Sequence, residues 1–309
     1  MPSLERLLEK TSRTFALSIP VLPEPTRREV MIAYLLFRIA DTFEDASHWS
    51  PERRIRALEE FGGLLMGEAE PDAADLSAAW VAEGASPHEG YRELLAATPF
   101  VLEQFFTLSA EAVGAIRPHV LRSARGMADF VARTKEGHLE LSSTAELQRY
   151  CYAVAGIVGE MLTELFLLRR GNLAPIAPRL RERASTFGEA LQLVNILKDS
   201  SDDASEGRRY LPARVPKAEV FALARKDLTI AGEYILALQS AAAPRGLIEF
   251  TALPVQLAWA TLERVEKRGP GSKVSRPELF LITQRLKLAL DRNEPAVPVP
   301  MRGAEGGSG

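Results

Sequence analysis

Four side chains near residue 40 have types and spacing that could bind a metal ion together with an anion. Tyr34, Arg38, Asp41 and Asp45 are separated by four, three and four residues, so on a helix they share an arc of roughly 60°. Two carboxylates one turn apart, with Glu44 beside them, offer the oxygen ligands that Mg²⁺ prefers, and substrate phosphates commonly complete such sites. For this motif alone, an acidic helix end that faces solvent is the more common interpretation.

A second stripe of the same kind lies in LQLVNILKDSSDD. Gln192, Asn195, Asp199 and Asp203 are separated by three, four and four residues, and both stripes adjoin apolar runs, MIAYLLF and ALQLVNIL. A solvated helix face would carry more charge on those neighbouring turns. Two acidic stripes that emerge from apolar helices therefore predict a cavity rather than two exposed surfaces.

The two stripes make a joint prediction if they oppose each other across a helical bundle. Their carboxylates would then repel by about 3 kcal/mol per pair at ~5 Å and an effective dielectric near 20. Bound divalent ions would relieve this repulsion. Diphosphate could bridge those ions while its remaining oxygens accept hydrogen bonds from Arg38, Lys198 and Arg208.

The elements that must position these side chains are helices. Apolar residues recur at three-and-four spacing along most of the chain, whereas period-two alternation is nearly absent, so the pattern predicts an all-α fold. Ser50-Pro51 and Ser143 with Glu146 are typical helix starts. The expected helices cover 24–47, 51–67, 90–115, 118–137, 144–170, 179–203, 217–240, 245–268 and 276–293. We interpret 67–90 as a surface excursion between helices, and 294–309 as a disordered Pro- and Gly-rich tail outside a single domain of 1–293.

Composition limits the classes of function. The 309 residues are 46% hydrophobic, and 41 acidic against 38 basic residues leave a net charge of −3, which argues against a broad basic face for nucleic acid. One cysteine, a charged start and no uninterrupted apolar stretch of ~18 residues predict a cytoplasmic protein whose membrane contact is peripheral. The scattered histidines do not predict a zinc site. Neither a GxGxxG nor a GxxxxGK[ST] motif occurs.

Several segments, in order, resemble the signatures of the squalene/phytoene synthase family. They are SRTFALSIPVLP, YLLFRIADTFED, YCYAVAGIVGEMLTELF, QLVNILKDSSDDASEGRRYLP, TALPVQLAWATL and KVSR. The resemblance runs from about Ser12 to Arg276. DTFED and ALPVQLAWATL are more similar to the squalene synthase branch than to the phytoene synthase branch.

This resemblance implies a single-domain isoprenoid synthase bundle with a central prenyl-binding cavity. The implied reaction joins two farnesyl diphosphates head to head: loss of one diphosphate gives an allylic cation, which the other double bond captures, and loss of a proton gives presqualene diphosphate. Loss of the second diphosphate, rearrangement and hydride delivery from NADPH give squalene. Mg²⁺ is the implied ion, with Mn²⁺ as an alternative. We expect transient contact with the inner membrane face and no obligate protein partner.

The resemblance also implies roles for residues at matching positions. The implied metal ligands are Asp41, Glu44, Asp45, Asp199 and Asp203. Catalytic roles are implied for Tyr150, Tyr34 and Arg208; substrate contacts for Ser12, Arg13, Arg38, Gln192, Asn195 and Lys198; and cofactor contacts for Lys273 and Arg276. Lys198 stands where the family usually has arginine, and lysine keeps the charge but loses the bidentate geometry. Ser200 and Ser201 replace bulkier residues within the second motif.

Alternatives remain open at this point. Tyr150 and Tyr34 could be core aromatic residues with a polar tip, and Gly156 and Gly159 could serve either close helix packing or room for a prenyl chain. The enzyme could release presqualene diphosphate, hydroxysqualene, dehydrosqualene or phytoene without reduction. A non-catalytic assembly factor on the same fold is the alternative from a different class, although it would have no reason to keep both acidic stripes.

Overall fold

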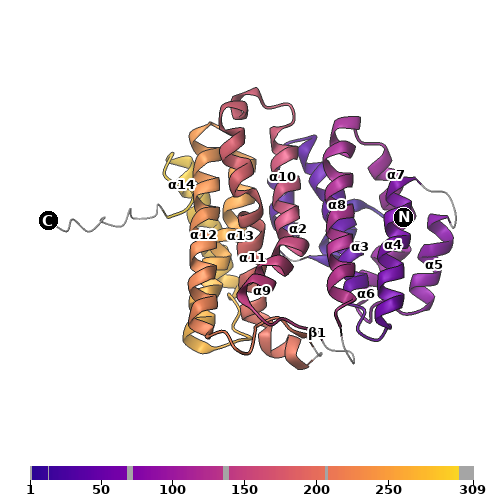
Figure 1. Ribbon diagram of the computed structural model, residues 1–309. Coiled ribbons are helices and arrows are strands. Elements are labelled where there is room, and N and C mark those ends of the chain that lie inside the picture. The colour runs from indigo at the N-terminus through magenta and orange to yellow at the C-terminus, as the bar shows by residue number, and fades with distance from the viewer. Residues whose placement is uncertain (1, 13, 68–71, 135–138, 206–207, 299–309) are drawn as a thin grey trace.

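Helices stand side by side through the molecule, as the computed structural model in Figure 1 shows. The structure describes residues 2–12, 14–67, 72–134, 139–205 and 208–298, and at 202–205 and 208 the backbone alone. Within these ranges the β structure is one parallel pair of two-residue strands, β1 (Leu139–Glu140) and β2 (Arg208–Arg209). The prediction of an all-α fold is therefore confirmed.

The helices have the following bounds. The first half holds α1 (Leu4–Thr11), α2 (Phe15–Ser18), η1 (Ile19–Val21), α3 (Thr26–Glu44), α4 (Pro51–Met66), α5 (Ala73–Ala82), α6 (Glu89–Ala96), α7 (Thr98–Phe106) and α8 (Ala110–Val131). The second half holds α9 (Thr144–Cys151), the π-helical η2 (Tyr152–Gly156), α10 (Ile157–Leu167), η3 (Gly171–Ile176), α11 (Ala177–Ser205), α12 (Lys217–Ser240), α13 (Arg245–Arg268) and α14 (Arg276–Asp291).

Two groups of helices meet at α10. On one side α3 packs against α4 and α8, and on the other α11 packs against α12 and α13, while α10 contacts α3, α8 and α11. Figure 1 shows this order from right to left. Ile32, Leu35, Leu36 and Ile39 of α3 are fully buried. Burial of these side chains holds the first acidic motif at the end of a rigid core helix.

Local signals set several boundaries as expected. The Ser50 hydroxyl accepts a hydrogen bond from the Arg53 N–H and the Ser143 hydroxyl accepts one from the Glu146 N–H, each at 3.3 Å. Pro118, in contrast, does not separate two helices. It lies inside α8, between the fully buried Ile116 and Val120. Burial on both sides offsets the backbone hydrogen bond that proline loses, so the expected boundary near 118 is wrong.

Two other segments depart from the expectation. Residues 67–90 contain α5. Asp72 caps this helix, because its carboxylate accepts hydrogen bonds from the Ala74 and Asp75 N–H groups. The helix buries Trp80 completely. The folded part also extends past 293, because the Ala296 and Val297 side chains are buried. Residues 299–309 lie outside the described part of the chain.

The run Thr144–Leu167 is the one candidate for a membrane span among the described residues. Its 24 residues include an 18-residue window with a mean hydropathy of 1.3, but 61% of that window is buried inside the fold. Four charged residues interrupt the run, Glu146, Arg149, Glu160 and Glu164, so the expectation that no uninterrupted apolar stretch of this length occurs still holds. The burial of the run is typical of a core helix.

Candidate active site

The first acidic motif forms a hydrogen-bonded and ion-paired stripe on α3. Arg38 Nη1 lies 3.3 Å from Asp41 Oδ2, and Arg38 Nε donates to the Tyr34 hydroxyl at 3.3 Å. That hydroxyl donates in turn to the Thr11 carbonyl at 3.0 Å. The guanidinium also lies 5.6 Å from the ring centre of Tyr34 and 5.7 Å from that of Tyr91. Arg38 is therefore fixed between two aromatic rings and a carboxylate.

Burial perturbs the titration of the motif. It raises the pKa of Asp41 to about 6, an effect that Arg38 opposes and Asp45 reinforces. Asp45 is exposed at the end of α3, where its N–H donates to the Asp41 carbonyl at 2.8 Å. The ionised form of Asp41 is therefore unfavourable with Arg38 as its only cationic partner, and a second cation nearby would stabilise it.

Glu44 belongs to a different environment from its two aspartate neighbours. Its side chain is 5% exposed, and one carboxylate oxygen accepts a hydrogen bond from the Tyr150 hydroxyl at 3.1 Å. The Tyr150 and Tyr210 hydroxyl oxygens lie 3.0 Å apart, and because Tyr150 gives its single proton to Glu44, Tyr210 is the donor of this second hydrogen bond. The two rings stack with centres 4.5 Å apart. Burial, with the charge of Glu44, raises the pKa of Tyr150 well above its usual value. The hydroxyl therefore stays protonated.

The described part of the second motif contributes the amides of Gln192 and Asn195 and the ion pair of Lys198 with Asp199. Gln192 and Asn195 lie on the face of α11 that turns towards α3 across a shared cavity. Lys198 Nζ donates to Asn195 Oδ1 at 3.3 Å and lies 3.1 Å from Asp199 Oδ2. Lys198 therefore contacts both the Asn195 amide and the Asp199 carboxylate.

A cavity of about 190 Å³ connects the two motifs. Its polar lining comes from both helices and consists of Tyr34, Arg38, Asp41, Gln192 and Asn195. Its apolar lining comes from η1, the α2 to α3 region, η2, α10, α11 and α13, and includes Phe15, Ile19, Phe37, Val154, Val158, Met161, Leu162, Phe187, Leu191 and Phe250. The predicted opposition of the two stripes across a cavity is confirmed for these five polar residues.

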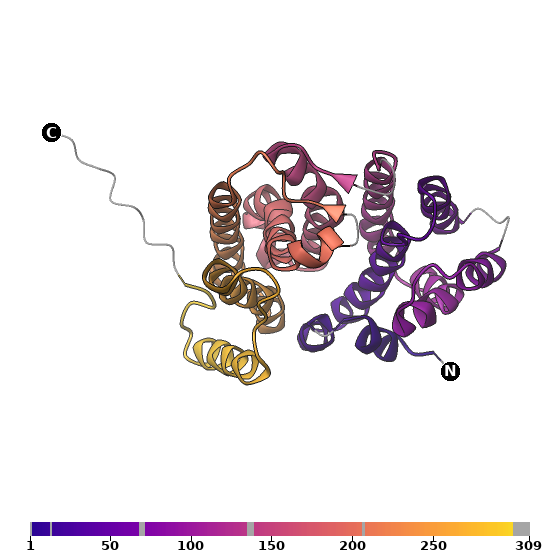
Figure 2. The same cartoon turned by 90° about the horizontal axis from the view of Figure 1, so that it is seen from below.

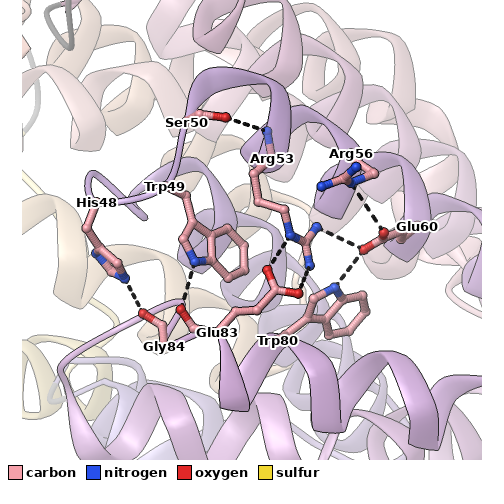
Figure 3. A network of polar contacts seen from close by, with 9 residues as sticks. All are labelled: His48, Trp49, Ser50, Arg53, Arg56, Glu60, Trp80, Glu83 and Gly84. Carbon is pink, nitrogen blue, oxygen red and sulfur yellow. Dashed lines mark hydrogen bonds and ion pairs between the residues drawn. The ribbon is translucent and has the colours of Figure 1, made fainter.

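The turn after the first motif is anchored from outside the cavity (Figure 3). Trp49 Nε1 donates to the Glu83 carbonyl at 3.0 Å, and the Arg53 guanidinium forms ion pairs with Glu83 at 2.5 Å and Glu60 at 3.2 Å. Trp80 Nε1 donates to Glu60 at 2.8 Å. These contacts link α4 to α5 and hold the segment that follows Asp45 in place.

Other predicted residues take more distant positions. The Ser12 hydroxyl accepts a hydrogen bond at 3.0 Å from the N–H of Phe15, the first residue of α2. Lys273 and Arg276 are exposed, but the Gly271 N–H donates to the Lys198 carbonyl at 2.7 Å, which holds their loop beside the second motif. Arg13 and the side chains of Asp203 and Arg208 lie outside the described residues.

Residues that the sequence did not single out complete the site. Tyr91 stacks over Arg38, and Tyr210 pairs with Tyr150. No spacing rule connects either to its partner, since the partners are 53 and 60 positions apart in the sequence. Phe187 and Phe250 line the cavity from two other helices. Tyr210 lies within the quoted segment QLVNILKDSSDDASEGRRYLP, and Phe250 directly precedes TALPVQLAWATL, but the resemblance assigned a role to neither residue.

The donor set is compatible with Mg²⁺ held together with a ligand. Asp41 lines the cavity and is destabilised as an anion, Asp45 lies one turn further on, and Glu44 is turned towards Tyr150. No cluster of three histidine, cysteine or acidic side chains close enough to bind a metal occurs within the described ranges. One or two carboxylates completed by phosphate oxygens is the arrangement that Mg²⁺ commonly takes.

A helical bundle around one apolar cavity, with two acidic helices at its polar end, defines the isoprenoid synthase class. The structure superimposes with a TM-score of 0.69 on the solved structure "The complex structure of TcSQS with ligand, BPH1237", at 24% identity over 98% of this chain and 92% of that one. This likeness establishes the fold.

The family model for squalene/phytoene synthase matches residues 8–282, and the chain belongs to that family. Similar curated proteins are squalene synthase of Eremothecium gossypii, 27% identical over 84% of this chain, and squalene synthase ERG9 of Candida albicans, 30% identical over 68% of it. The matches span 61% and 44% of those two relatives, so the chain corresponds to about half of their length.

Proposed function

We propose that this protein condenses two farnesyl diphosphates head to head through presqualene diphosphate. The observation that carries the proposal is a cavity whose apolar walls end at Arg38 and Asp41 on one helix and Gln192 and Asn195 on another. A prenyl diphosphate has the same division into an apolar chain and an anionic end.

The residues at the polar end have distinct roles in this proposal. Asp41 and Asp45, with Asp199 and Asp203 from the second motif, would hold Mg²⁺, which when bound neutralises the departing diphosphate. Arg38 offers guanidinium N–H groups to diphosphate oxygens from a position already fixed by Tyr34 and Tyr91. The aromatic walls of the cavity would keep water away from the allylic cation that forms when diphosphate leaves.

Tyr150 is proposed to act in the first half-reaction. Its hydroxyl is protonated, buried and oriented by Glu44 and Tyr210. The segment η2 begins two residues later and supplies Val154 to the cavity wall. Tyr150→Phe should lower formation of presqualene diphosphate while leaving conversion of added presqualene diphosphate intact. Normal condensation in this variant would leave the tyrosine as a packing residue.

Reduction to squalene with NADPH is the further part of the proposal. Its support is the branch resemblance of DTFED and ALPVQLAWATL together with the exposed Lys273 in the loop that contacts the Lys198 carbonyl. Release of presqualene diphosphate, hydroxysqualene, dehydrosqualene or phytoene is the alternative. We place the reaction in the cytoplasm, at the membrane surface.

One incubation distinguishes these possibilities. The protein is mixed with farnesyl diphosphate and Mg²⁺, with and without NADPH, and the lipid products are identified by mass spectrometry. Squalene that appears only with NADPH supports the full reaction, and an identical product profile in both samples leaves a condensing enzyme. Absence of any C30 product with the described fold intact would favour a non-catalytic role.

A further inference from the structure

The outer face of α14 carries apolar side chains that no other described element covers. Among the described residues six large hydrophobic side chains are exposed, and three of them are Phe280 at 61%, Leu281 at 53% and Leu288 at 47%. At about 100° per residue these three fall within an arc of roughly 100°. The opposite face of the helix holds the buried Leu286 and packs against α13.

Basic side chains border this apolar arc on both sides. On the helical wheel Arg276 and Lys287 flank one edge and Arg285 the other, and all three are exposed. The two acidic residues of α14 are already paired within the protein, Glu278 with Arg264 and Asp291 with Arg245. Arg276 and Arg285 have no ion-pair partner within the described ranges. The face is therefore apolar at its centre and cationic at its margins.

We infer that α14 docks the protein on an anionic lipid surface. A helix that lies in the membrane interface buries a stripe of Phe and Leu among the acyl chains, while Lys and Arg at the edges contact lipid phosphates. The arrangement on α14 has this distribution. The inference rests on the proposed function in one respect, because a lipid substrate and product give the docking its purpose.

The position of α14 suits this role. Figure 2 shows it at the lower left margin of the molecule, outside the rest of the bundle, with the N-terminal helices along the same lower edge. That edge includes α2, where Leu17 is 54% exposed and the neighbouring Phe15 lines the cavity. Docking by this face would bring the α2 wall of the cavity towards the lipid.

The test is co-sedimentation of the full chain with vesicles of phosphatidylglycerol and phosphatidylcholine, without substrate. We expect Phe280→Asn with Leu281→Asn to lower the partition coefficient at least about 10-fold. Arg285→Gln should lower it about 5-fold and flatten its salt dependence. Phe106→Asn on α7 is the matched control, because that phenylalanine is 46% exposed elsewhere, and it should partition like the parent.

Two results would overturn the inference. One is unchanged partitioning of the doubly substituted variant, and the other is a lipid-free dimer, seen by light scattering, that the same substitutions dissociate, since a second copy would then occupy the face. If the variant folds poorly, hydrogen exchange of the parent decides: vesicles should slow exchange in 276–291, and no slowing there contradicts docking. Because no substrate is present, failure of the proposed condensation would leave all these outcomes unaffected.

Discussion

The two helices that carry the acidic motifs contribute to the cavity in different ways. On α3 the charged groups themselves line the cavity, and Arg38 already pairs with Asp41 at 3.3 Å. On α11 the cavity is lined by the amides of Gln192 and Asn195, whereas the Lys198 to Asp199 pair lies further along. Similar spacing in the sequence has therefore produced two different surfaces.

This difference separates two tasks. The α3 wall contains a fixed cation and a carboxylate whose pKa is raised to about 6, so its electrostatics are organised before a ligand arrives. The α11 wall offers neutral hydrogen-bonding groups near its mouth, where Asn195 is exposed. In the proposed reaction, α3 would position the first diphosphate, and the neutral side chains of α11 would adjust to the Mg²⁺ and substrate that bind beside it.

The largest expected effect comes from removing one carboxylate of each motif. Asp41→Asn and Asp199→Asn should each lower turnover of farnesyl diphosphate on the order of 10³-fold, because each removes charge that would hold Mg²⁺ against the diphosphate. Turnover at ordinary Mg²⁺ concentrations measures this, and circular dichroism checks the fold. Unaltered activity in either variant would rule out that motif as a metal site.

A smaller effect distinguishes the two cations. Arg38 and Lys198 have nearly equal side-chain exposure, 26% and 23%, so exposure alone predicts equal losses. Arg38→Met should nevertheless lower the free energy of unfolding by about 2–3 kcal/mol, since it strands Asp41 in the cavity wall. Lys198→Met should cost less than about 1 kcal/mol. Urea denaturation of both variants makes the comparison, and equal losses would remove the distinction drawn between the helices.

The approach of α11 to α10 gives a third test. A Cβ at Gly159 would lie 2.0 Å from the Ala184 carbonyl oxygen, so Gly159→Ala should cost about 1–3 kcal/mol of stability. Gly159 also lines the cavity, and the glycine therefore serves packing and space together. Gly114→Ala on α8 is the control, because nothing lies within 4 Å of its added Cβ. It should stabilise the protein by up to about 1 kcal/mol. Thermal denaturation that ranks the two variants in the opposite order would contradict the close crossing.

The smallest effect concerns a carboxylate in the middle of α11. Burial raises the pKa of Glu189 to about 7, so the folded state holds this proton more tightly than the unfolded state does. Stability should therefore fall as the pH rises from about 4.5 to 7. Glu189→Gln lacks this loss and should gain about 1 kcal/mol relative to the parent across that window, after allowance for solvent screening. Denaturation midpoints at both pH values measure the gain, and a constant difference between the two proteins would argue against it.

Periodicity predicted most of the long helices well, because burial of one face decides them. The single helix expected over 90–115 is wrong, since α6 ends at Ala96, α7 ends at Phe106 and α8 begins at Ala110. Periodicity failed where contacts with distant parts of the chain determine whether a helix forms or continues. In α5, alanines weaken the periodic signal and the burial of Trp80 becomes evident only in the fold. At Pro118 the buried neighbours Ile116 and Val120 carry the helix past a residue that usually ends one. The failures at α5 and Pro118 come from tertiary contacts that a local window does not contain.

The site could be predicted in part for a similar reason. The stripe of Tyr34, Arg38 and Asp41 depends on spacing within one helix, and the structure places all three on the cavity. Glu44 lies only one residue from Asp45, yet its partner is Tyr150, which is 106 residues away along the chain. Spacing within a motif cannot reveal such a contact. The role predicted for Glu44 as a metal ligand stays a prediction beside this observed hydrogen bond.

The short π-helix η2 limits which insertions and deletions this family member can tolerate. Its wider turn holds one residue more than an α-helical turn would, so Tyr152–Gly156 is equivalent to a single-residue insertion between α9 and α10. Deleting one residue there would restore an ordinary helix and rotate every later side chain by about 100°. Gly159 would leave its contact with α11 while Tyr150 kept its own with Glu44. Alignments of relatives should therefore place length changes outside this segment.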